Sequence, residues 1–355
     1  MINRFRAIIY KLFDSFLMLG IYLYNYFWYS IAGTKICIEA SSNCQLNCVC
    51  CRRPEIENGP IGKGNLKFED FKRFVNTHPT FRQIELSNYG EMFMNPELVE
   101  IIEYAYNKKI VLTADNGVNL NTVSDEVLRC LVKYQFKSLK VSIDGACNET
   151  YEIYRRGGNF HKVIDNIKKI NSLKSEYNSK FPTLIWKFVV FGHNEHEISA
   201  AREMSKTLNM NFEAVFNCID GYSPIKNEAL VRRELGAVSN DNYRETHNNK
   251  TFMFFCNQFW SSVQINWDGK LLGCCFNKNV NFGNVFSLGL RKCLNTKAYR
   301  EIIKLVTNQA RYNSEIPLPC STCLVYESMK KHNTFYRTGV CGMNALRLIV
   351  NLLKS

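Results

Sequence analysis

Short apolar runs alternate with helical patterns along much of the chain. The runs that predict strands are 36–40, 83–87, 109–113, 138–143, 184–190 and 212–216. Apolar residues recur at helical spacing between them, as in 96–106, 125–134, 160–173 and 195–208. Repeated strand–helix units are typical of a parallel α/β sheet. Because six units are fewer than the eight of a closed barrel, the pattern predicts a partial (β/α)6 TIM-like barrel over residues 35–216.

The rest of the chain divides into four further segments. Residues 1–34 are apolar at helical spacing and begin with basic residues, which predicts an N-terminal helix. Residues 217–250 are rich in Asn, Arg and Glu, as expected of a linker with one helix. We expect a small α+β domain over 251–330, with a hairpin turn at Asp268 and Gly269, and an amphipathic helix over 331–355.

The N-terminal segment leaves three arrangements open. No residue from Ser15 to Thr34 is charged, and this length is enough to span a bilayer. Its tyrosines and asparagine suit a membrane interface better than hydrocarbon. The helix therefore crosses a membrane, lies on its surface or packs on the domain. A cleaved secretory signal is disfavoured, because export would place the thiols discussed below in an oxidising compartment.

Charge and cysteine content narrow the class of protein. The 355 residues carry a formal charge of +13 and include fifteen cysteines. An odd number of cysteines cannot pair completely, and disulfide scaffolds are short, so reduced thiols in the cytoplasm are expected. Excess Lys and Arg also suit RNA binding. The core shows no basic stripe with interleaved aromatic residues, so a nucleic-acid partner is not expected.

Three cysteines follow the first predicted strand. Cys44, Cys48 and Cys51 form a C-x3-C-x2-C pattern, with Cys50 as an alternative to Cys51 in register. Structural zinc usually takes four protein ligands, whereas three thiolates suit an iron–sulfur cluster with one open iron. The pattern resembles the radical S-adenosylmethionine (SAM) superfamily, in which SAM chelates the fourth iron of a [4Fe–4S] cluster.

Further residues carry this resemblance in the same order along the chain. The segment Tyr89-Gly90-Glu91-Met92 is similar to the Gly-Gly-Glu-Pro motif of the family, although Tyr89 and Met92 depart from it. The resemblance implies that Gly90, Glu91, Asn116, Ser142 and Arg155 bind SAM, with Ser142 and Arg155 at its carboxylate. Arg156 is the weaker choice for that last role. The adenine contacts stay unassigned, and no catalytic residue is implied beyond the SAM-bound cluster.

A second set of cysteines lies in the C-terminal region. Cys256, Gly269 and Cys274 form a C-x12-G-x4-C pattern, followed by Cys320 and Cys323. This pattern resembles the auxiliary-cluster domains called SPASM or, in a shorter form, twitch. The resemblance implies that Cys256, Cys274, Cys320 and Cys323 hold one auxiliary [4Fe–4S] cluster. Cys275 is an alternative to Cys274, and a four-cysteine zinc site is an alternative to the cluster.

The resemblance also implies an activity. A reduced cluster would cleave SAM to a 5′-deoxyadenosyl radical that abstracts hydrogen from substrate, and the auxiliary cluster would accept an electron. We expect an oxidoreductase acting on a sugar, cyclitol or cell-surface-glycan precursor. The implied partners are an acidic flavodoxin- or ferredoxin-type electron donor and, through residues 1–34, a membrane surface. The alternatives are a radical SAM peptide or protein maturase, a zinc-binding scaffold and an RNA-binding protein.

Overall fold

The computed structural model describes residues 35–51, 58–79, 81–217, 221–239, 256, 258–306 and 319–332. The expected N-terminal helix lies outside the described residues, as does almost all of the expected C-terminal helix. Within the described ranges, no helix combines the length and the apolar character needed to cross a membrane.

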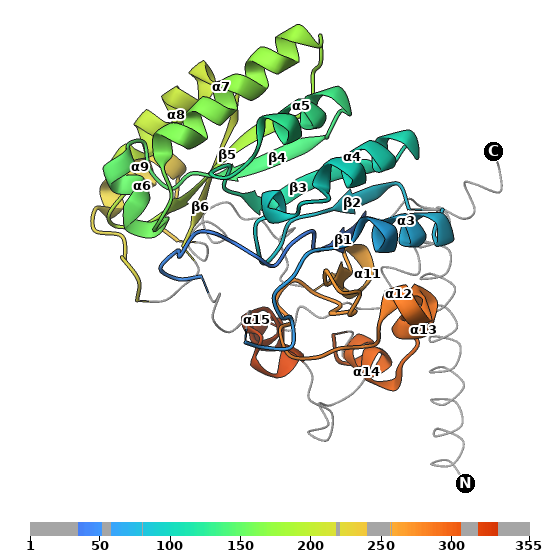
Figure 1. The fold of residues 1–355 in the computed structure, drawn as a ribbon. Coiled ribbons are helices and arrows are strands. Elements are labelled where there is room, and N and C mark those ends of the chain that lie inside the picture. Colours follow the sequence, from blue (N-terminus) through green and yellow to red (C-terminus); the bar gives the residue numbers. More distant parts are fainter. Residues whose placement is uncertain are drawn as a thin grey trace, which may run out of the picture.

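A seven-stranded sheet in which all strand pairs are parallel forms the centre of the molecule (Figure 1). Its strand order is β6-β5-β4-β3-β2-β1-β7. The strands are β1 (Lys35–Ile38), β2 (Gln83–Glu85), β3 (Val111–Val118), β4 (Ser138–Ser142), β5 (Thr183–Val190), β6 (Asn211–Phe216) and β7 (Gln264–Ile265). The first six confirm the predicted partial barrel. The seventh comes from the C-terminal region, and its pairing with β1 was not predicted.

Helices cover one face of this sheet (Figure 1). They are α3 (Phe68–Thr77), α4 (Leu98–Asn107), α5 (Asp125–Lys133), α6 (Asn148–Tyr154), α7 (Phe160–Glu176), α8 (Ile198–Thr207) and α9 (Glu228–Leu235), with 3₁₀ turns η1 (Met92–Met94) and η2 (Glu195–Glu197). Side chains fix several starts: Ser124 accepts a hydrogen bond from the Val127 amide at α5, and Asn159 from the Lys162 amide at α7. The helices bury apolar faces against the strands.

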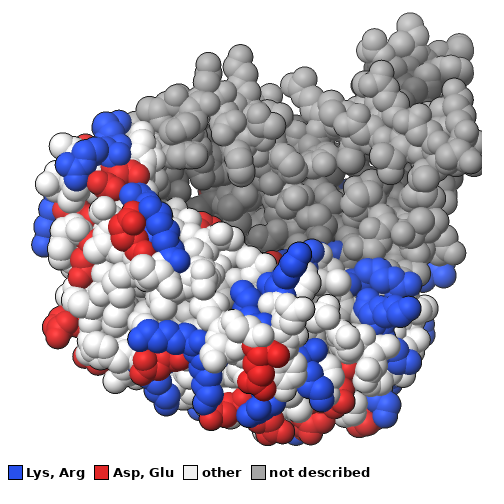
Figure 2. Space-filling model, turned by 90° about the horizontal axis from the view of Figure 1, so that it is seen from above, with Lys and Arg blue, Asp and Glu red and all other residues white. Residues whose placement is uncertain are grey.

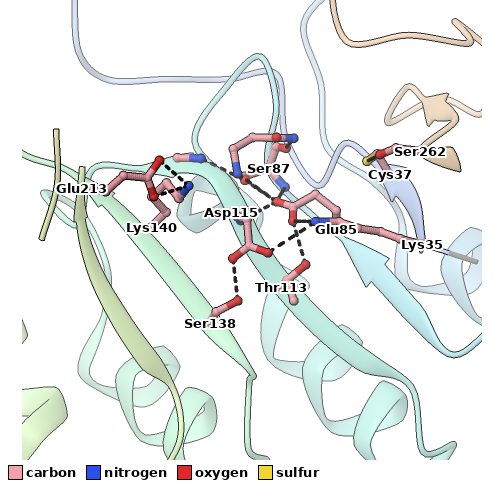
Figure 3. Close-up of polar contacts among 12 residues, drawn as sticks. Lys35, Cys37, Glu85, Ser87, Thr113, Asp115, Ser138, Lys140, Glu213 and Ser262 are labelled. Atoms are coloured by element: carbon pink, nitrogen blue, oxygen red, sulfur yellow. Dashed lines mark hydrogen bonds and ion pairs between the residues drawn. The ribbon is translucent and has the colours of Figure 1, made fainter. Parts of the chain in front are cut away.

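The two faces of the sheet differ in chemistry because side chains alternate along each strand. On the helix-covered face Ile36, Ile84, Leu139 and Trp186 are at most 1% exposed. The residues between them, which line the concave face, include charged and hydroxyl side chains (Figure 3). The apolar face forms the hydrophobic core with the helices, and the polar concave face is not part of that core.

The C-terminal region packs beside β1 and α3 (Figure 1). It contains α11 (Gln258–Ser261), α12 (Val285–Leu288), α13 (Leu290–Leu294), α14 (Lys297–Val306), η3 (Pro319–Thr322) and α15 (Leu324–His332). The expected turn is present, since Ile265 and Leu271 form an antiparallel bridge around Gly269, whose φ is +85°. Between residues 258 and 290, the described chain has more short helices and less strand than the sequence suggested.

Candidate functional site

The first cysteine loop lies at the carboxyl end of β1, where parallel α/β folds place their chemistry. Backbone hydrogen bonds tie it to the end of α6: the Asn47 amide donates to the Arg156 carbonyl at 2.9 Å, and the Val49 amide to the Tyr154 carbonyl at 3.2 Å. Cys44 is half-buried, Cys48 is buried and Cys51 is exposed. The loop is therefore anchored at its centre and open to solvent at its end.

The effects of the three predicted thiols on one another's pKa values indicate that they lie near one another. Burial, and then negative charge on Glu91, Cys48 and Cys51, raise the pKa of Cys44 to about 12. Burial and then Cys51 also raise the pKa of Cys48, which Arg155 opposes. Because iron replaces thiol protons on binding, this donor set fits a thiolate-ligated cluster.

The Cys50 thiol lies near Tyr154 and Tyr222. After burial, negative charge on Cys50 contributes to raising the pKa of both phenols. Negative charge on Cys51 contributes to raising the pKa of both Cys44 and Cys48. This supports Cys51 as the third member of the set.

Arg155 connects the cysteine loop to the end of β4. Its Nε donates to Asp144 Oδ2 at 2.6 Å, and its Nη1 lies 3.7 Å from Cys48 Sγ. Asp144 is fully buried and also accepts from the Val189 amide at 2.8 Å. Burial disfavours the charged guanidinium and is the largest single effect, but Asp144, with smaller contributions from Cys48, Tyr154 and Tyr151, outweighs that cost. The pKa of Arg155 is therefore raised and the residue stays cationic. A fixed cation thus faces the thiols.

Gly90 and Glu91 shape the opposite wall. A Cβ on Gly90 would lie 2.2 Å from the Ser41 carbonyl oxygen, so only glycine lets this segment approach the cysteine loop. The Glu91 carboxylate accepts the Asn119 amide at 2.7 Å and the Phe93 amide at 3.3 Å. Burial raises the pKa of Glu91 to about 7. Through these contacts Glu91 fixes the backbone at Phe93 and at Asn119 relative to each other.

Asn116 and Ser142 lie on adjacent strands. The Asn116 Nδ2 donates to the Ser87 carbonyl at 2.6 Å, and the Asn116 carbonyl accepts from Lys187 Nζ at 3.3 Å. Ser142 is 5% exposed, and its hydroxyl lies 2.8 Å from where a Cβ on Gly117 would be. The structure therefore brings all five predicted SAM-binding residues to the carboxyl ends of β2, β3 and β4.

The second set of thiols gathers in the C-terminal region. Burial raises the pKa of Cys320, and negative charge on Cys256, Cys274 and Cys323 raises it further. Burial, and then Cys323 and Cys275, raise the pKa of Cys256 to about 11. Cys320 thus lies within electrostatic reach of the other three predicted ligands, and Cys256 within reach of Cys274, Cys323 and Cys275. Among the described residues, no three ligand side chains lie close enough together to hold a single metal ion.

A network of charged side chains lines the concave face of the sheet (Figure 3). Glu85 is fully buried, and its carboxylate accepts from Thr113 Oγ1 at 2.7 Å and from Lys35 Nζ at 3.0 Å. Lys140 on β4 pairs with Glu213 on β6 at 2.7 Å, across the intervening strand β5. Such a face would be costly if it enclosed apolar atoms, so it suits a polar occupant.

Two residues to which the sequence did not point complete the site. Glu39 is 1% exposed and accepts the Tyr89 amide at 2.9 Å and the Gly90 amide at 3.1 Å. Asp144 orients Arg155. The Tyr89 side chain takes no part in the site and contacts the C-terminal region. The Ile143-Asp144-Gly145 strand end was the available signal for Asp144. A single Glu at the end of a strand gave none for Glu39.

Comparison with known proteins identifies the class. The profile of the radical SAM superfamily matches residues 38–204, and that of SPASM, an iron–sulfur cluster-binding domain, matches residues 256–324. An AdoMet-dependent heme synthase of Methanosarcina barkeri is 28% identical over 180 residues, which are 50% of this chain and 48% of the relative. The match thus spans about half the length of that relative.

Solved structures share the fold. SuiB of Streptococcus suis, bound to S-adenosylmethionine, aligns with a TM-score of 0.60 at 15% identity, covering 84% of this chain and 72% of that one. The enzyme anSMEcpe with bound AdoMet aligns with a TM-score of 0.56 at 16% identity, covering 83% and 88%.

Residues 38–204 belong to the radical SAM superfamily, and residues 256–324 form a SPASM domain. Members of this superfamily use a [4Fe–4S] cluster and SAM, and SPASM is an iron–sulfur cluster-binding domain. The family match decides between iron–sulfur and the zinc alternative that the cysteine spacing left open.

Proposed function

We propose that the protein is a radical SAM oxidoreductase whose substrate binds on the polar concave face of the sheet. The observation that carries this proposal is the charged network of Lys35, Glu85, Lys140 and Glu213, which lies on the same sheet as the SAM-binding end. The proposed domains are the core at 35–216, the linker at 217–250 and the auxiliary domain at 251–330.

The proposed ligand sets follow from the gathered thiols. Cys44, Cys48 and Cys51 would hold the SAM-binding cluster, and the auxiliary cluster would be held by Cys256, Cys274, Cys320 and Cys323. When bound, the first cluster with SAM supplies the radical that takes hydrogen from substrate, and the second supplies an acceptor for one electron.

The chain's own residues bind and orient these groups. Arg155 and Ser142 would hold the SAM carboxylate, because the Arg155 guanidinium lies against Cys48 and Ser142 ends β4, two residues before the Asp144 that pairs with Arg155. Gly90 gives that loop its close packing, and Asn116 fixes the neighbouring strand end.

The polar concave face supports a polyhydroxylated substrate, such as a sugar, a cyclitol or a cell-surface-glycan precursor. Carboxylates, ammonium groups and hydroxyls offer both donors and acceptors to such a molecule. Thr113, Ser138 and Ser87 add hydroxyls to the charged side chains there. An aliphatic substrate would displace water from these groups without offering them hydrogen bonds.

The positive charge of the chain supports an acidic electron donor. Acidic and basic side chains are interspersed over most of the described surface in Figure 2, so the excess of +13 is not gathered in one stripe there. A flavodoxin- or ferredoxin-type protein would be attracted by the net field. We also infer a reducing cytoplasmic location, because thiolate clusters of this kind are lost on oxidation.

The test is anaerobic reconstitution followed by iron and sulfide analysis and a SAM-cleavage assay with dithionite. The wild-type chain is expected to release 5′-deoxyadenosine. Cys320→Ala should keep SAM cleavage within about threefold and lose oxidised product, since only the auxiliary site is changed. Cys44→Ala should abolish cleavage.

Cys130→Ala is the matched control, because this buried cysteine lies on α5 away from both thiol sets. It should behave as wild type. Loss of SAM cleavage in Cys320→Ala with the fold retained would contradict the division of labour between the two clusters.

A second candidate is a peptide or protein maturase. SuiB, which shares the fold, has been solved with its precursor peptide SuiA, with a TM-score of 0.57 at 13% identity. The discriminating measurement is the stimulation of SAM cleavage by candidate substrates. Stimulation by sugars or cyclitols supports the main proposal, and stimulation only by peptides supports maturation.

A further inference from the structure

Tyr89 occupies an unusual place between the two cysteine-bearing regions. It stands where relatives usually have the first glycine of their Gly-Gly-Glu-Pro motif. Its phenol donates a hydrogen bond to the Asn277 carbonyl at 2.7 Å, across 188 positions of sequence. Its ring packs on Ile61 and Leu272, which are 0% and 1% exposed. A side chain that departs from the motif thus joins the core to the auxiliary domain.

The backbone of Tyr89 is fixed on the side of the SAM-binding end. The Tyr89 and Gly90 amides both donate to Glu39, at 2.9 and 3.1 Å. Gly90 lies directly against Ser41 and Ser42, which precede Cys44 in the cysteine loop. The position of Tyr89 is therefore set by the same contacts that shape the first thiol set.

The phenol of Tyr89 reaches a rigid turn on the other side. Asn277 lies three residues after Cys274, and its amide donates to the Cys274 carbonyl at 3.3 Å. The Asn277 side chain is 1% exposed and donates to the Leu272 carbonyl at 2.6 Å and the Val280 carbonyl at 2.7 Å. Holding the Asn277 carbonyl therefore holds the segment that carries Cys274 and Cys275.

The charge environment agrees with this geometry. Burial, and then negative charge on Cys274 and Cys275, raise the pKa of Tyr89 well above its ordinary value. The phenol thus keeps its proton and remains a donor. Its hydrogen is donated to the Asn277 carbonyl and polarises the peptide at the end of the turn that carries Cys274 and Cys275, and hydrogen bonding and exclusion of water are both known to tune cluster potentials.

We propose that Tyr89 is a positioning residue that holds the auxiliary-cluster turn against the SAM-binding end and thereby tunes the auxiliary cluster. Its hydrogen bond fixes the Asn277 turn, and its ring packs between Ile61 of the core and Leu272 of the auxiliary domain. The inference rests on the proposed ligand set at Cys274, but its test needs no substrate.

The experiment compares anaerobically reconstituted Tyr89→Phe with wild type by electron paramagnetic resonance and redox titration. Tyr89→Phe keeps the ring and removes the donor. We expect the midpoint potential of the auxiliary cluster to become more negative and its signal to broaden. The SAM-induced change in the signal of the first cluster, the iron content and substrate-free SAM cleavage should stay within twofold of wild type.

Tyr134→Phe is the matched control. The Tyr134 phenol donates to Glu103 Oε1 at 2.6 Å on the outer helices, so the same atom is deleted far from both thiol sets. It should leave every readout unchanged. An auxiliary signal and potential in Tyr89→Phe identical to wild type would overturn the proposal.

A second variant keeps the test valid if Tyr89→Phe fails to fold. A fluorinated tyrosine incorporated at position 89 retains the ring and strengthens the donor, so the auxiliary potential should move in the positive direction. No shift, or a shift in the negative direction, would overturn the proposal. Failure of the oxidoreductase assignment is separable, because it would appear in product analysis while the two potentials remained as expected.

Discussion

At the scale of residues, the adjacent residues Arg155 and Arg156 differ in burial and therefore in their expected roles. Arg155 is turned inward, with a side chain 16% exposed and paired with Asp144, whereas Arg156 is exposed. We expect Arg155→Lys to weaken SAM binding about tenfold, or about 1.4 kcal/mol, because an ammonium cannot replace the planar guanidinium fork. Anaerobic calorimetry measures this. Arg156→Lys is the control, and equal affinities in the two variants would argue against Arg155 at the SAM carboxylate.

Glu39 gives a dependence of stability on pH. Burial raises its pKa to about 8 in the folded protein, against 4.5 for an ordinary Glu. Folding thus favours the protonated form, and the stability it contributes is present below pH 4.5 and lost as the pH rises through 8. Glu39→Gln should flatten the fall in unfolding free energy between pH 6 and pH 8 by up to about 1.4 kcal/mol per pH unit. Urea denaturation measures this slope.

The exposed Glu100 on α4 provides the control for that measurement. Glu100→Gln should leave the slope as in wild type. A slope in Glu39→Gln equal to that of wild type would show that Glu39 is already ionised at pH 6.

The sequence predicts site residues only where a local pattern carries them. Cys44, Cys48 and Cys51 are predicted from their spacing, as are the C-terminal cysteines. Glu39 could not be found this way, because its partners Tyr89 and Gly90 lie about fifty positions away and meet it only in the folded sheet. Hydrogen bonds between distant segments leave no periodicity in the chain.

At the scale of elements, long periodic segments were predicted well. The predicted strand 184–190 matches β5 (Thr183–Val190), and the helix 125–134 matches α5 (Asp125–Lys133). The pairing of β7 with β1 could not be predicted, because the two strands lie far apart in the sequence and no local pattern records their contact.

Neighbouring residues on β5 should respond in opposite ways to substitution. Phe188 is fully buried on the helix-covered face, so Phe188→Ala should lower the free energy of unfolding by about 3–5 kcal/mol. Lys187 faces the concave side, and burial followed by Arg155 lowers its pKa. Lys187→Met should change stability by less than about 1 kcal/mol but reduce product formed per SAM cleaved. Urea denaturation and product analysis test both, and a large loss of stability in Lys187→Met would make it a structural residue.

At the scale of the whole molecule, the C-terminal domain docks on the core through specific contacts. Trp267 Nε1 donates to the Ile61 carbonyl at 3.1 Å, and its ring covers Gly64 so closely that a Cβ there would lie 2.5 Å from it. Asn266 donates to the same carbonyl at 2.9 Å. Cysteine spacing predicted both domains but not this joint, since the contacts span about 200 positions.

Removing the Trp267 ring should loosen that joint. We expect Trp267→Ala to lower the free energy of unfolding by about 2–4 kcal/mol and to speed proteolysis near Gly64. Trp267→Phe keeps most of the ring and should lose about 1 kcal/mol, the value of the hydrogen bond. Denaturation and limited proteolysis measure both, and equal effects in the two variants would show that packing contributes little.

The pairing of β7 with β1 also has a consequence for synthesis. Cys37 on β1 contacts Ser262, which is 225 positions further along the chain. At the usual rate of about 5–20 residues per second, roughly 10–45 seconds separate the translation of these two segments. During that time the strand that leads into the first cysteine loop has one edge without its final neighbour, and such edges are prone to pair with other chains. Protection of the free β1 edge from pairing with other chains is therefore needed until β7 has been translated.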